Sequence, residues 1–367
     1  MRGAARRPLS AAVPAAAALL IVALALLGLS RGAGMLVPLA EALMVWFILN
    51  RFASAIVQVP HLGPAFGRRG ALGLAILIVF GLGLASVYSG VRGLLAAGPQ
   101  ALGMTASLDL LFERIAATFG NGTAEALDRM VDAIGLERLM QELVLGLVSL
   151  INQFGVVAIL VAFLLVDQAI YPAKMRALFP DPARRARVEA LLSELSGRIS
   201  SYLWMMTQVS ALTAMLSGLV MLLLGLENVL FWSILIFALN FIPTLGSIIG
   251  TILPTAFALI QFGEIAPAAV VCAGIGSVQF AIGNVLLPRM AGQSMNLSLV
   301  VTILALMLWG GLWGVTGLFL AVPLTAMIVI VAARFEATRP VAILLSRTGR
   351  LGAAPPPPGA DALDKKG

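Results

Sequence analysis

Residues 240 to 254 read NFIPTLGSIIGTILP and place two prolines, two glycines and an asparagine inside a long apolar stretch. The chain from Asn228 to Phe262 carries no charged residue over 35 positions. As one straight helix this stretch would measure about 50 Å, well beyond the ~30 Å hydrocarbon core of a bilayer. The segment must therefore bend.

The residue types in this stretch indicate where it bends. Pro243 removes a backbone donor and disfavours helix at the preceding residue, while Gly246 and Gly250 permit close or unusual backbone geometry. We expect Pro254 to repeat the interruption further along the chain. Backbone groups freed in this way must be buried in protein or line a wet cavity, because lipid offers them no hydrogen bonds.

The bulk composition agrees with a membrane location. The 367 residues are 60% hydrophobic and only 11% charged, with a mean hydropathy of +1.02, whereas charged residues make up about a quarter of soluble domains. We therefore expect an all-α polytopic membrane protein of about 6 to 8 membrane helices, two of them broken or re-entrant segments in the C-terminal half. The net charge of +7 does not indicate nucleic-acid binding, because no basic patch is interleaved with stacking aromatics.

The apolar segments and the charges between them predict the topology. The N-terminal apolar stretch is followed at once by a second one, which favours a spanning hairpin over a cleaved signal. Lys and Arg gather before the first span, after the second and after the fourth, which makes those segments cytoplasmic and predicts that both termini lie in the cytoplasm. The expected spans lie near 11–30, 35–53, 71–91, 144–166 and 203–226.

Two connecting segments have the periodicity of amphipathic helices. In the inner one, residues 182–203, apolar side chains recur at helical spacing, with Asp181 as N-cap and Pro182 at the first helical position. The outer one follows the third span and has an acidic balance. We divide the chain into transmembrane helices 1–3 (1–95), an extracytoplasmic amphipathic segment (96–143), transmembrane helix 4 (144–170), a cytoplasmic amphipathic helix (171–202), a transport core with broken helices (203–335) and a disordered cytoplasmic tail (336–367).

A second interruption is expected in residues 297–333, which are again apolar and too long for one span, with WGGLWGVTG (309–317) in the middle and Pro323 beyond. Each interrupted segment is either a re-entrant hairpin or a kinked full span. Two hairpins place Arg289 in the cytoplasm, whereas two full crossings move it outside. The positive-inside rule favours the hairpins, on the position of this one arginine.

Three stretches carry a family resemblance: NFIPTLGSIIGTILP (240–254), GNVLLPRMAGQSMNLSLV (283–300) and LWGGLWGVTGLFLAVPLT (308–325). In order and spacing they resemble the signature stretches of the autoinducer-2 exporter (AI-2E) family of membrane transporters. The resemblance implies an inner-membrane permease that forms homo-oligomers. Members of that family are described as exporters of autoinducer-2 or as sodium(lithium)/proton antiporters. The residues that match the family pattern are Asn240, Pro243, Gly246, Pro254, Asn284, Pro288, Arg289, Gly292, Trp309, Gly310, Gly314, Gly317 and Pro323.

A solute site can be proposed at the broken helices, because helix ends and unpaired carbonyls hold ions or polar solutes in secondary transporters. We expect the two interruptions to meet, with Asn240, Gln279 and Asn284 supplying neutral hydrogen-bonding side chains. The alternative is that these amides only join helices. The complete set of substrate-path or helix-break candidates is Asn240, Pro243, Gly246, Gly250, Pro254, Gln279, Asn284, Pro288, Arg289, Gly292, Gly310, Gly314, Gly317 and Pro323.

Ionisable residues inside a membrane are functional candidates, and only Glu41 and Asp167 come near the spans. They are the possible proton carriers, although Asp167 is expected at the cytoplasmic interface. The broken-helix region lacks the buried carboxylate that a cation/proton antiporter uses, which favours export of a small polar solute such as the quorum-sensing signal autoinducer-2. A sodium(lithium)/proton antiporter and a non-transporting membrane scaffold remain as alternatives.

The sequence does not predict an enzyme, a cofactor or a metal site. The only histidine, His61, falls in a loop, and Cys272 lies in an apolar run with no acidic or histidine companion nearby. No phosphate loop of the GxxxxGK[ST] type occurs, so transport must use an ion gradient or the gradient of the solute. The expected partners are membrane lipid, a small polar solute or cation, and further copies of the chain.

Overall fold

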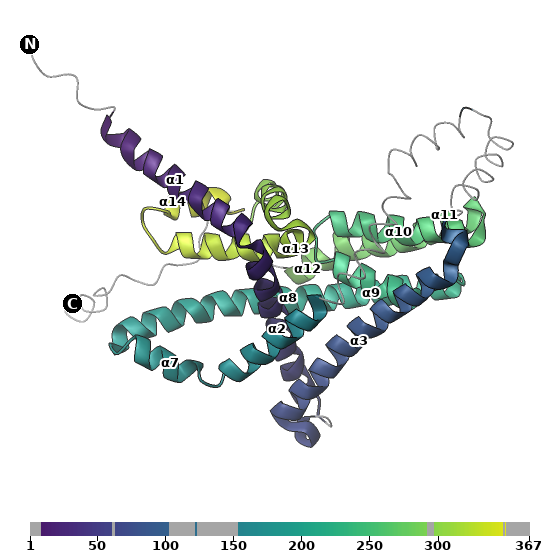
Figure 1. The fold of residues 1–367 in the computed structure, drawn as a ribbon, viewed down its shortest axis with the longest axis horizontal. Coiled ribbons are helices and arrows are strands. Elements are labelled where there is room, and N and C mark those ends of the chain that lie inside the picture. Colours follow the sequence, from purple (N-terminus) through teal and green to yellow (C-terminus); the bar gives the residue numbers. More distant parts are fainter. Residues whose placement is uncertain are drawn as a thin grey trace, which may run out of the picture. The chain divides into compact units, whose positions relative to one another are not determined.

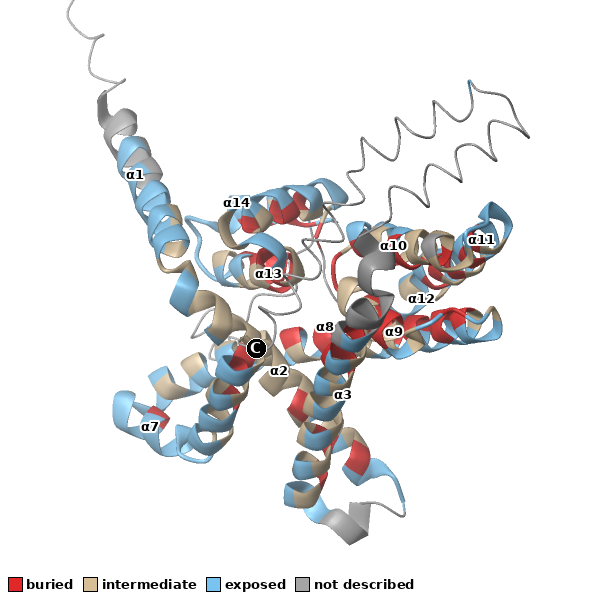
Figure 2. Cartoon of the chain, turned by 45° about the vertical axis from the view of Figure 1, so that its right-hand side comes forward, coloured by how far each residue is buried: buried red, intermediate tan, exposed pale blue. Residues whose placement is uncertain are grey.

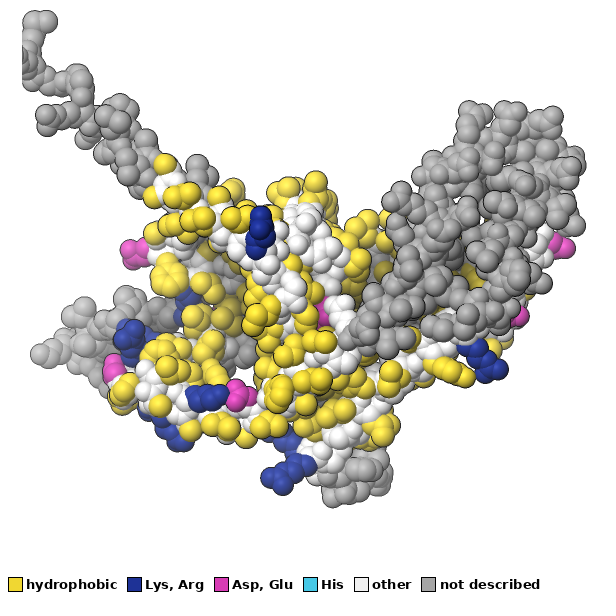
Figure 3. Space-filling model, in the orientation of Figure 1, with side chains coloured by type: hydrophobic (Ala, Val, Ile, Leu, Met, Phe, Trp, Pro, Cys, Tyr) yellow, Lys and Arg dark blue, Asp and Glu magenta, His cyan; other side chains and the backbone are white. Residues whose placement is uncertain are grey.

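A computed structural model describes residues 9–60, 63–102, 122, 153–291, 297–347 and 349, and these residues are built from helices. Five of the described helices are long and apolar enough to cross a membrane, or six if the bent pair Gln153–Asp167 and Tyr171–Leu178 is one span. Figure 3 shows a surface dominated by hydrophobic side chains, with few Lys or Arg. The expectation of an all-α polytopic membrane protein is confirmed. The predicted segment 96–143 lies largely outside the described residues.

The chain divides into two compact units, whose helices are labelled in Figure 1. The first unit contains α1 (Leu9–Arg31), the beginning of α2 (Ala33–Gln58) up to Glu41, α13 (Leu299–Ala333) and α14 (Arg339–Leu345). The second unit, Ala42–Ser294, contains the rest of α2, α3 (Gly63–Leu102), α7 (Tyr171–Leu178), α8 (Pro182–Leu223), α9 (Val229–Leu239), α10 (Leu245–Phe262), α11 (Ile265–Ala281), the π-helical turn η1 (Ile282–Leu286) and α12 (Leu287–Ala291).

Helix α8 joins two segments that the sequence suggested were separate. The predicted amphipathic helix and the predicted fifth span form one helix of 42 residues. Its start agrees with the prediction, because the Asp181 carboxylate accepts hydrogen bonds from the backbone N–H groups of Ala183 and Arg184, and Pro182 follows. No proline lies between Pro182 and Leu223, and the ion pair between Arg198 and Glu194 links successive turns, so nothing ends the helix at the boundary.

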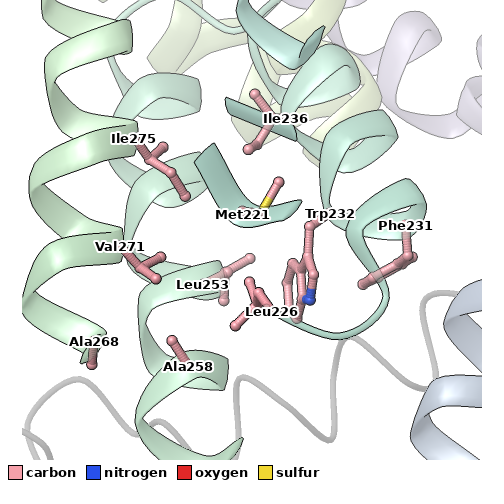
Figure 4. Packing of buried hydrophobic residues seen from close by; sticks show 10 residues of the cluster. All are labelled: Met221, Leu226, Phe231, Trp232, Ile236, Leu253, Ala258, Ala268, Val271 and Ile275. Atoms are coloured by element: carbon pink, nitrogen blue, oxygen red, sulfur yellow. The ribbon is translucent and has the colours of Figure 1, made fainter. Parts of the chain in front are cut away.

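The second unit contains two hydrophobic clusters. One joins α2, α3 and the helix Gln153–Asp167 through Leu49, Ala75 and Val161. The other lies among α8, α9, α10 and α11, whose mutually facing sides are buried (Figure 2). Figure 4 shows its ten residues, contributed by all four helices and the loop after α8: Met221, Leu226, Phe231, Trp232, Ile236, Leu253, Ala258, Ala268, Val271 and Ile275.

Residues 228–262 form a helical hairpin, which we call the first hairpin, with α9 and α10 as its arms. The two ends of this segment meet, because the Gln261 side chain accepts a hydrogen bond from the Glu227 N–H at 2.8 Å and donates one to the Gly225 carbonyl at 2.9 Å. A kinked span crossing the membrane would separate these residues by the full length of the segment. The hairpin alternative for this segment is therefore the one observed.

The turn of the first hairpin lies between Leu239 and Leu245, as Pro243 and Gly246 predicted. Thr244 has a φ of 65°, which is uncommon for a β-branched residue and costs about 1–3 kcal/mol. Gly246 approaches the other arm so closely that a Cβ atom there would overlap the Leu239 carbonyl oxygen. The turn therefore depends on a glycine at this position.

The prediction that Pro254 interrupts the chain is wrong, because Pro254 lies inside α10 and the helix continues to Phe262. A proline removes only one helical hydrogen bond and crowds the carbonyl four residues earlier, here that of Gly250. Packing of α10 between α9 and α11 holds the helix together across this missing bond. Pro323 is likewise inside α13, beyond the interruption.

The second interrupted segment also folds back on itself. The indole Nε1 of Trp309 donates a hydrogen bond to Thr325 Oγ1 at 3.1 Å, although 16 residues separate them. In a straight helix these residues would lie about 24 Å apart, so α13 consists of two arms. They meet at Gly314, whose φ of 61° and ψ of −139° are open only to glycine. We call this segment the second hairpin.

Gly246→Ala tests the close approach in the first hairpin. We expect the free energy of unfolding to fall by at least about 1–3 kcal/mol, because the new methyl group forces the two arms apart. Thermal unfolding of the purified protein in detergent measures this. The control is Gly276→Ala in α11, where a Cβ meets nothing within 4 Å; equal stability of the two variants would contradict the hairpin geometry.

Cysteine labelling tests the re-entrant path. In a Cys272→Ser background, Glu227→Cys and Glu264→Cys should react with a membrane-impermeant maleimide from the same side, because the first hairpin returns before α11 begins. Arg289→Cys should react from the opposite side, since Ile265–Met290 is long enough for one crossing. Labelling of positions 227 and 264 from opposite sides would mean that residues 228–262 cross completely.

Candidate functional site

The turn of the first hairpin is tied to α8 by a polar contact. Asn240 follows α9 directly, and its Nδ2 donates a hydrogen bond to Ser210 Oγ at 3.1 Å. Ser210 is fully buried. This hydrogen bond links the end of α9 to α8 at the break.

Gln279 lies where α10 and α11 cross, and its amide nitrogen is buried without a hydrogen-bond partner among the described residues. The residue is 7% exposed, and its Nε2 makes no hydrogen bond with the described part of the chain. The amide nitrogen faces Gly250, where a Cβ would lie 3.3 Å from it. Because Pro254 has no N–H, the Gly250 carbonyl also lacks its usual helical donor. A buried donor and a carbonyl without its helical partner thus occur at one crossing.

Helix α8 places a line of small polar residues on the side that packs in the cluster with α9, α10 and α11. Ser210, Thr213 and Ser217 are all 0% exposed. The Thr213 hydroxyl bonds back to the carbonyl of Val209, whereas Ser217 Oγ has no partner among the described residues. Next to Ser217, a Cβ at Gly218 would lie 2.5 Å from the Ser233 hydroxyl of α9. These small residues allow close helix contact, as the sequence indicated, and leave one buried hydroxyl available.

The family positions after Gln279 lie on an exposed surface of the isolated chain. Asn284 is exposed within η1, and its Nδ2 bonds to the carbonyl of Phe280 in its own helix. The wide π-turn fits the sequence, since Pro288 cannot donate to the Asn284 carbonyl. Pro288 and Arg289 are exposed in α12, and Gly292 lies outside the described residues. The structure thus brings Gln279, but not Asn284, into the buried crossing.

The remaining candidates belong to the first unit or to the end of the fourth span. In the second hairpin, a Cβ at Gly310 would lie 2.7 Å from Leu318, and one at Gly317 would overlap the Trp309 carbonyl. Glu41 accepts a hydrogen bond from Thr316 Oγ1 at 2.7 Å. The two hairpins are in different units, so the expectation that the two interruptions meet stays a prediction.

Asp167 is bound to Lys174 across the bend between Gln153–Asp167 and α7. Lys174 Nζ lies 2.8 Å from both carboxylate oxygens, and the two side chains are 51% and 59% exposed. Exposed ion pairs of this kind contribute little to stability. The arrangement favours the topological role expected for Asp167.

A sequence model of the AI-2E family transporter matches residues 17–336. The chain belongs to the AI-2E transporter family. Among relatives of this family, the chain is 28% identical over 327 residues to the AI-2 transport protein TqsA of Escherichia coli K12, covering 88% of this chain and 92% of that protein. It is 27% identical to a putative transport protein of Haemophilus influenzae, covering 79% and 86% of the two chains.

Membership of the AI-2E family fixes the broad function. Another relative, the putative transport protein YhhT of Escherichia coli K12, is 30% identical over 203 residues, 54% of this chain and 57% of its own. Because it has several helices long and apolar enough to span a membrane and belongs to a family of transporters, the chain is a multi-pass membrane transporter. The resemblance noted in the three signature stretches is confirmed.

Ser210→Ala tests the contact that holds the first hairpin of this AI-2E protein. We expect a loss of roughly 1–3 kcal/mol in unfolding free energy, because the Asn240 amide loses its acceptor in a partly buried place. Tryptophan fluorescence during thermal unfolding reports it. Ser277→Ala is the matched control, since that hydroxyl is exposed and bonds only within α11. Similar losses in both variants would show that Ser210 has no special role.

Proposed function

We propose that the protein exports a small, uncharged, polar solute through the second unit, beside the first hairpin. Autoinducer-2 is the first solute to test. The observation that carries the proposal is the buried Gln279 amide, whose Nε2 has no partner within the described chain and faces the α10 backbone at Gly250.

An unpaired buried amide is expensive. Leaving a buried donor unsatisfied costs about 1–3 kcal/mol, and Ser217 Oγ adds a second such group on the neighbouring helix α8. A solute with its own hydroxyl or carbonyl groups recovers this free energy when it binds. Native proteins retain such unpaired groups mostly where function requires them, which supports a binding role for Gln279 over a purely structural one.

The charge distribution supports an uncharged solute. Residues 228–262 contain no charged side chain, and the groups at the crossing are an amide, hydroxyls and a carbonyl. These groups can donate to and accept from hydroxyl and carbonyl groups, but they cannot compensate a full charge in a low-dielectric region. The name of the relative TqsA, an AI-2 transport protein, supports autoinducer-2 as the solute.

The location, the partners and the energy source that we propose for the transporter follow from its charged segments, its exposed apolar faces and its sequence motifs. We place it in the inner (plasma) membrane with both termini in the cytoplasm, because Lys and Arg dominate the segments assigned to that side. Its helices expose apolar faces, and we assign these faces to contacts with lipid and with further copies of the chain in a homo-oligomer. No ATP-binding motif is present, so the solute moves on an ion gradient or on its own gradient.

Sodium(lithium)/proton antiport is the second candidate. The observation that favours it is Glu41, a carboxylate within the apolar helix α2 that contacts the second hairpin. A pulse of sodium or lithium applied to proteoliposomes, with internal pH recorded, separates this activity from solute export.

Efflux of labelled autoinducer-2 from proteoliposomes tests the solute site. We expect Gln279→Leu to reduce the initial rate about tenfold, the effect of losing a hydrogen bond of ~1–3 kcal/mol. The same variant should be as stable as the wild type or more so, because an apolar side chain of similar size replaces an unpaired amide. Gln208→Leu, at an exposed position of α8, serves as the control and should transport normally.

The paired readouts distinguish transport from structure. If Gln279 only joins helices, Gln279→Leu lowers stability and leaves the rate per folded molecule unchanged, which contradicts the proposal. A wild-type protein that is folded but moves neither autoinducer-2 nor sodium, lithium or protons would instead favour the scaffold alternative.

A further inference from the structure

Helix α7 turns away from the fourth span soon after Asp167. The helices Gln153–Asp167 and Tyr171–Leu178 are bent by 66° relative to each other. With 8 residues α7 is about 12 Å long, so at this angle it advances only about 5 Å along the axis of the span. Helix α7 therefore stays near the level at which the span ends, which is the depth of lipid headgroups.

Helix α7 packs on the protein by one residue and exposes apolar side chains beside it. Met175 is 4% exposed, whereas Tyr171 and Leu178 are 46% and 69% exposed. Tyr171 and Leu178 are seven residues apart, so they lie on the same side of the helix. Exposed apolar and aromatic side chains next to basic ones are typical of helices that lie in the headgroup layer.

The same segment has an excess of positive charge. Residues 171–187 contain five basic residues and one acidic residue, which caps α8. The basic residues are Lys174, Arg176, Arg184, Arg185 and Arg187. Lys174 and Arg185 have carboxylate neighbours. In the part of the chain that the structure describes, Arg176, Arg184 and Arg187 make no ion pair. Three guanidinium groups thus remain for an anion from outside the chain.

Two of these arginines are held in place by their surroundings. The Arg184 guanidinium lies 5.8 Å from the centre of the Phe179 ring, in the loop between α7 and α8. Arg187 Nε donates a hydrogen bond to the Ala183 carbonyl at 3.4 Å. The two arginines are three residues apart and are neighbours on one side of α8. Their other N–H groups can bind a phosphate group, which arginine contacts through two N–H groups at once.

We propose that α7 and the start of α8 form a binding site for an anionic phospholipid of the cytoplasmic leaflet. The lipid phosphate binds Arg184 and Arg187, and its acyl chains lie against Tyr171 and Leu178. A cluster of basic residues directly after a spanning helix attracts anionic headgroups, and the exposed apolar side chains favour a lipid over a free phosphate ion. The site is separate from the first hairpin and does not depend on which solute the protein carries.

Binding of phosphatidylglycerol to the purified full-length protein tests the site. The lipid is titrated into protein in a neutral detergent, and the bound lipid is counted by native mass spectrometry. We expect the wild type to prefer phosphatidylglycerol to phosphatidylcholine. The double variant Arg184→Gln/Arg187→Gln should bind phosphatidylglycerol at least tenfold more weakly. The control, Arg68→Gln/Arg69→Gln, removes the same charge from exposed positions of α3 and should bind like the wild type.

Four results would overturn the proposal. They are an unchanged affinity in Arg184→Gln/Arg187→Gln, an equal loss in the α3 control, equal binding of phosphatidylcholine, and displacement of the lipid by an equal concentration of inorganic phosphate. The last result would leave a site for small anions only. If the double variant does not fold, Arg187→Gln alone keeps the contact between Arg184 and Phe179 and should still bind at least threefold more weakly.

Fluorescence quenching tests the depth of α7. In a Cys272→Ser background, Leu178→Cys is labelled with a fluorophore and reconstituted into phosphatidylglycerol vesicles that contain a lipid with a quencher on its acyl chain. The label at position 178 should be quenched. The control is Ser193→Cys, exposed nine residues after Arg184 and so on the opposite side of α8, and it should be quenched less. Equal quenching at the two positions contradicts the lipid contact.

Discussion

The backbone of a membrane protein must satisfy its own hydrogen bonds, and this constraint decides how the chain can break its helices. Unpaired N–H and C=O groups are tolerated only where other parts of the protein cover them. At the first hairpin the cover comes from α8 and α11, with Asn240 bonded to the buried Ser210. At the second hairpin, Trp309 and Trp313 bond to Thr325 and to the Leu29 carbonyl. Each break is thus accompanied by long-range polar contacts.

Local signals predicted the positions of the breaks but not their partners. Pro243, Gly246 and the length of residues 228–262 were enough to predict a turn, and the WGGLWGVTG stretch predicted the second. Pro254 was misleading, because whether a proline ends a helix depends on the helices packed around it. The choice between hairpin and kink depends on Gln261 reaching Gly225 and Glu227, a contact that no local pattern contains.

The candidate site was predicted to a similar extent. Asn240 and Gln279 were identified as polar groups in apolar surroundings, but their roles differ: Asn240 has a partner on α8, and the Gln279 Nε2 has none in the described chain. Sequence alone cannot separate a satisfied amide from an unsatisfied one, because both look like an isolated polar residue in an apolar run. The same holds for Glu41, since its partner Thr316 comes from the distant second hairpin.

Helix α8 has a mechanical consequence. Its 42 residues make an unbroken rod about 63 Å long, roughly twice the thickness of the hydrocarbon core. One half carries charged side chains and is held by Arg51 of α2 through Ser200 and Ser201, while the other half carries Ser210 and Ser217. Because α8 is continuous through Ser200 and Ser201, its charged half and the half that bonds to Asn240 are parts of one element, with no joint between them.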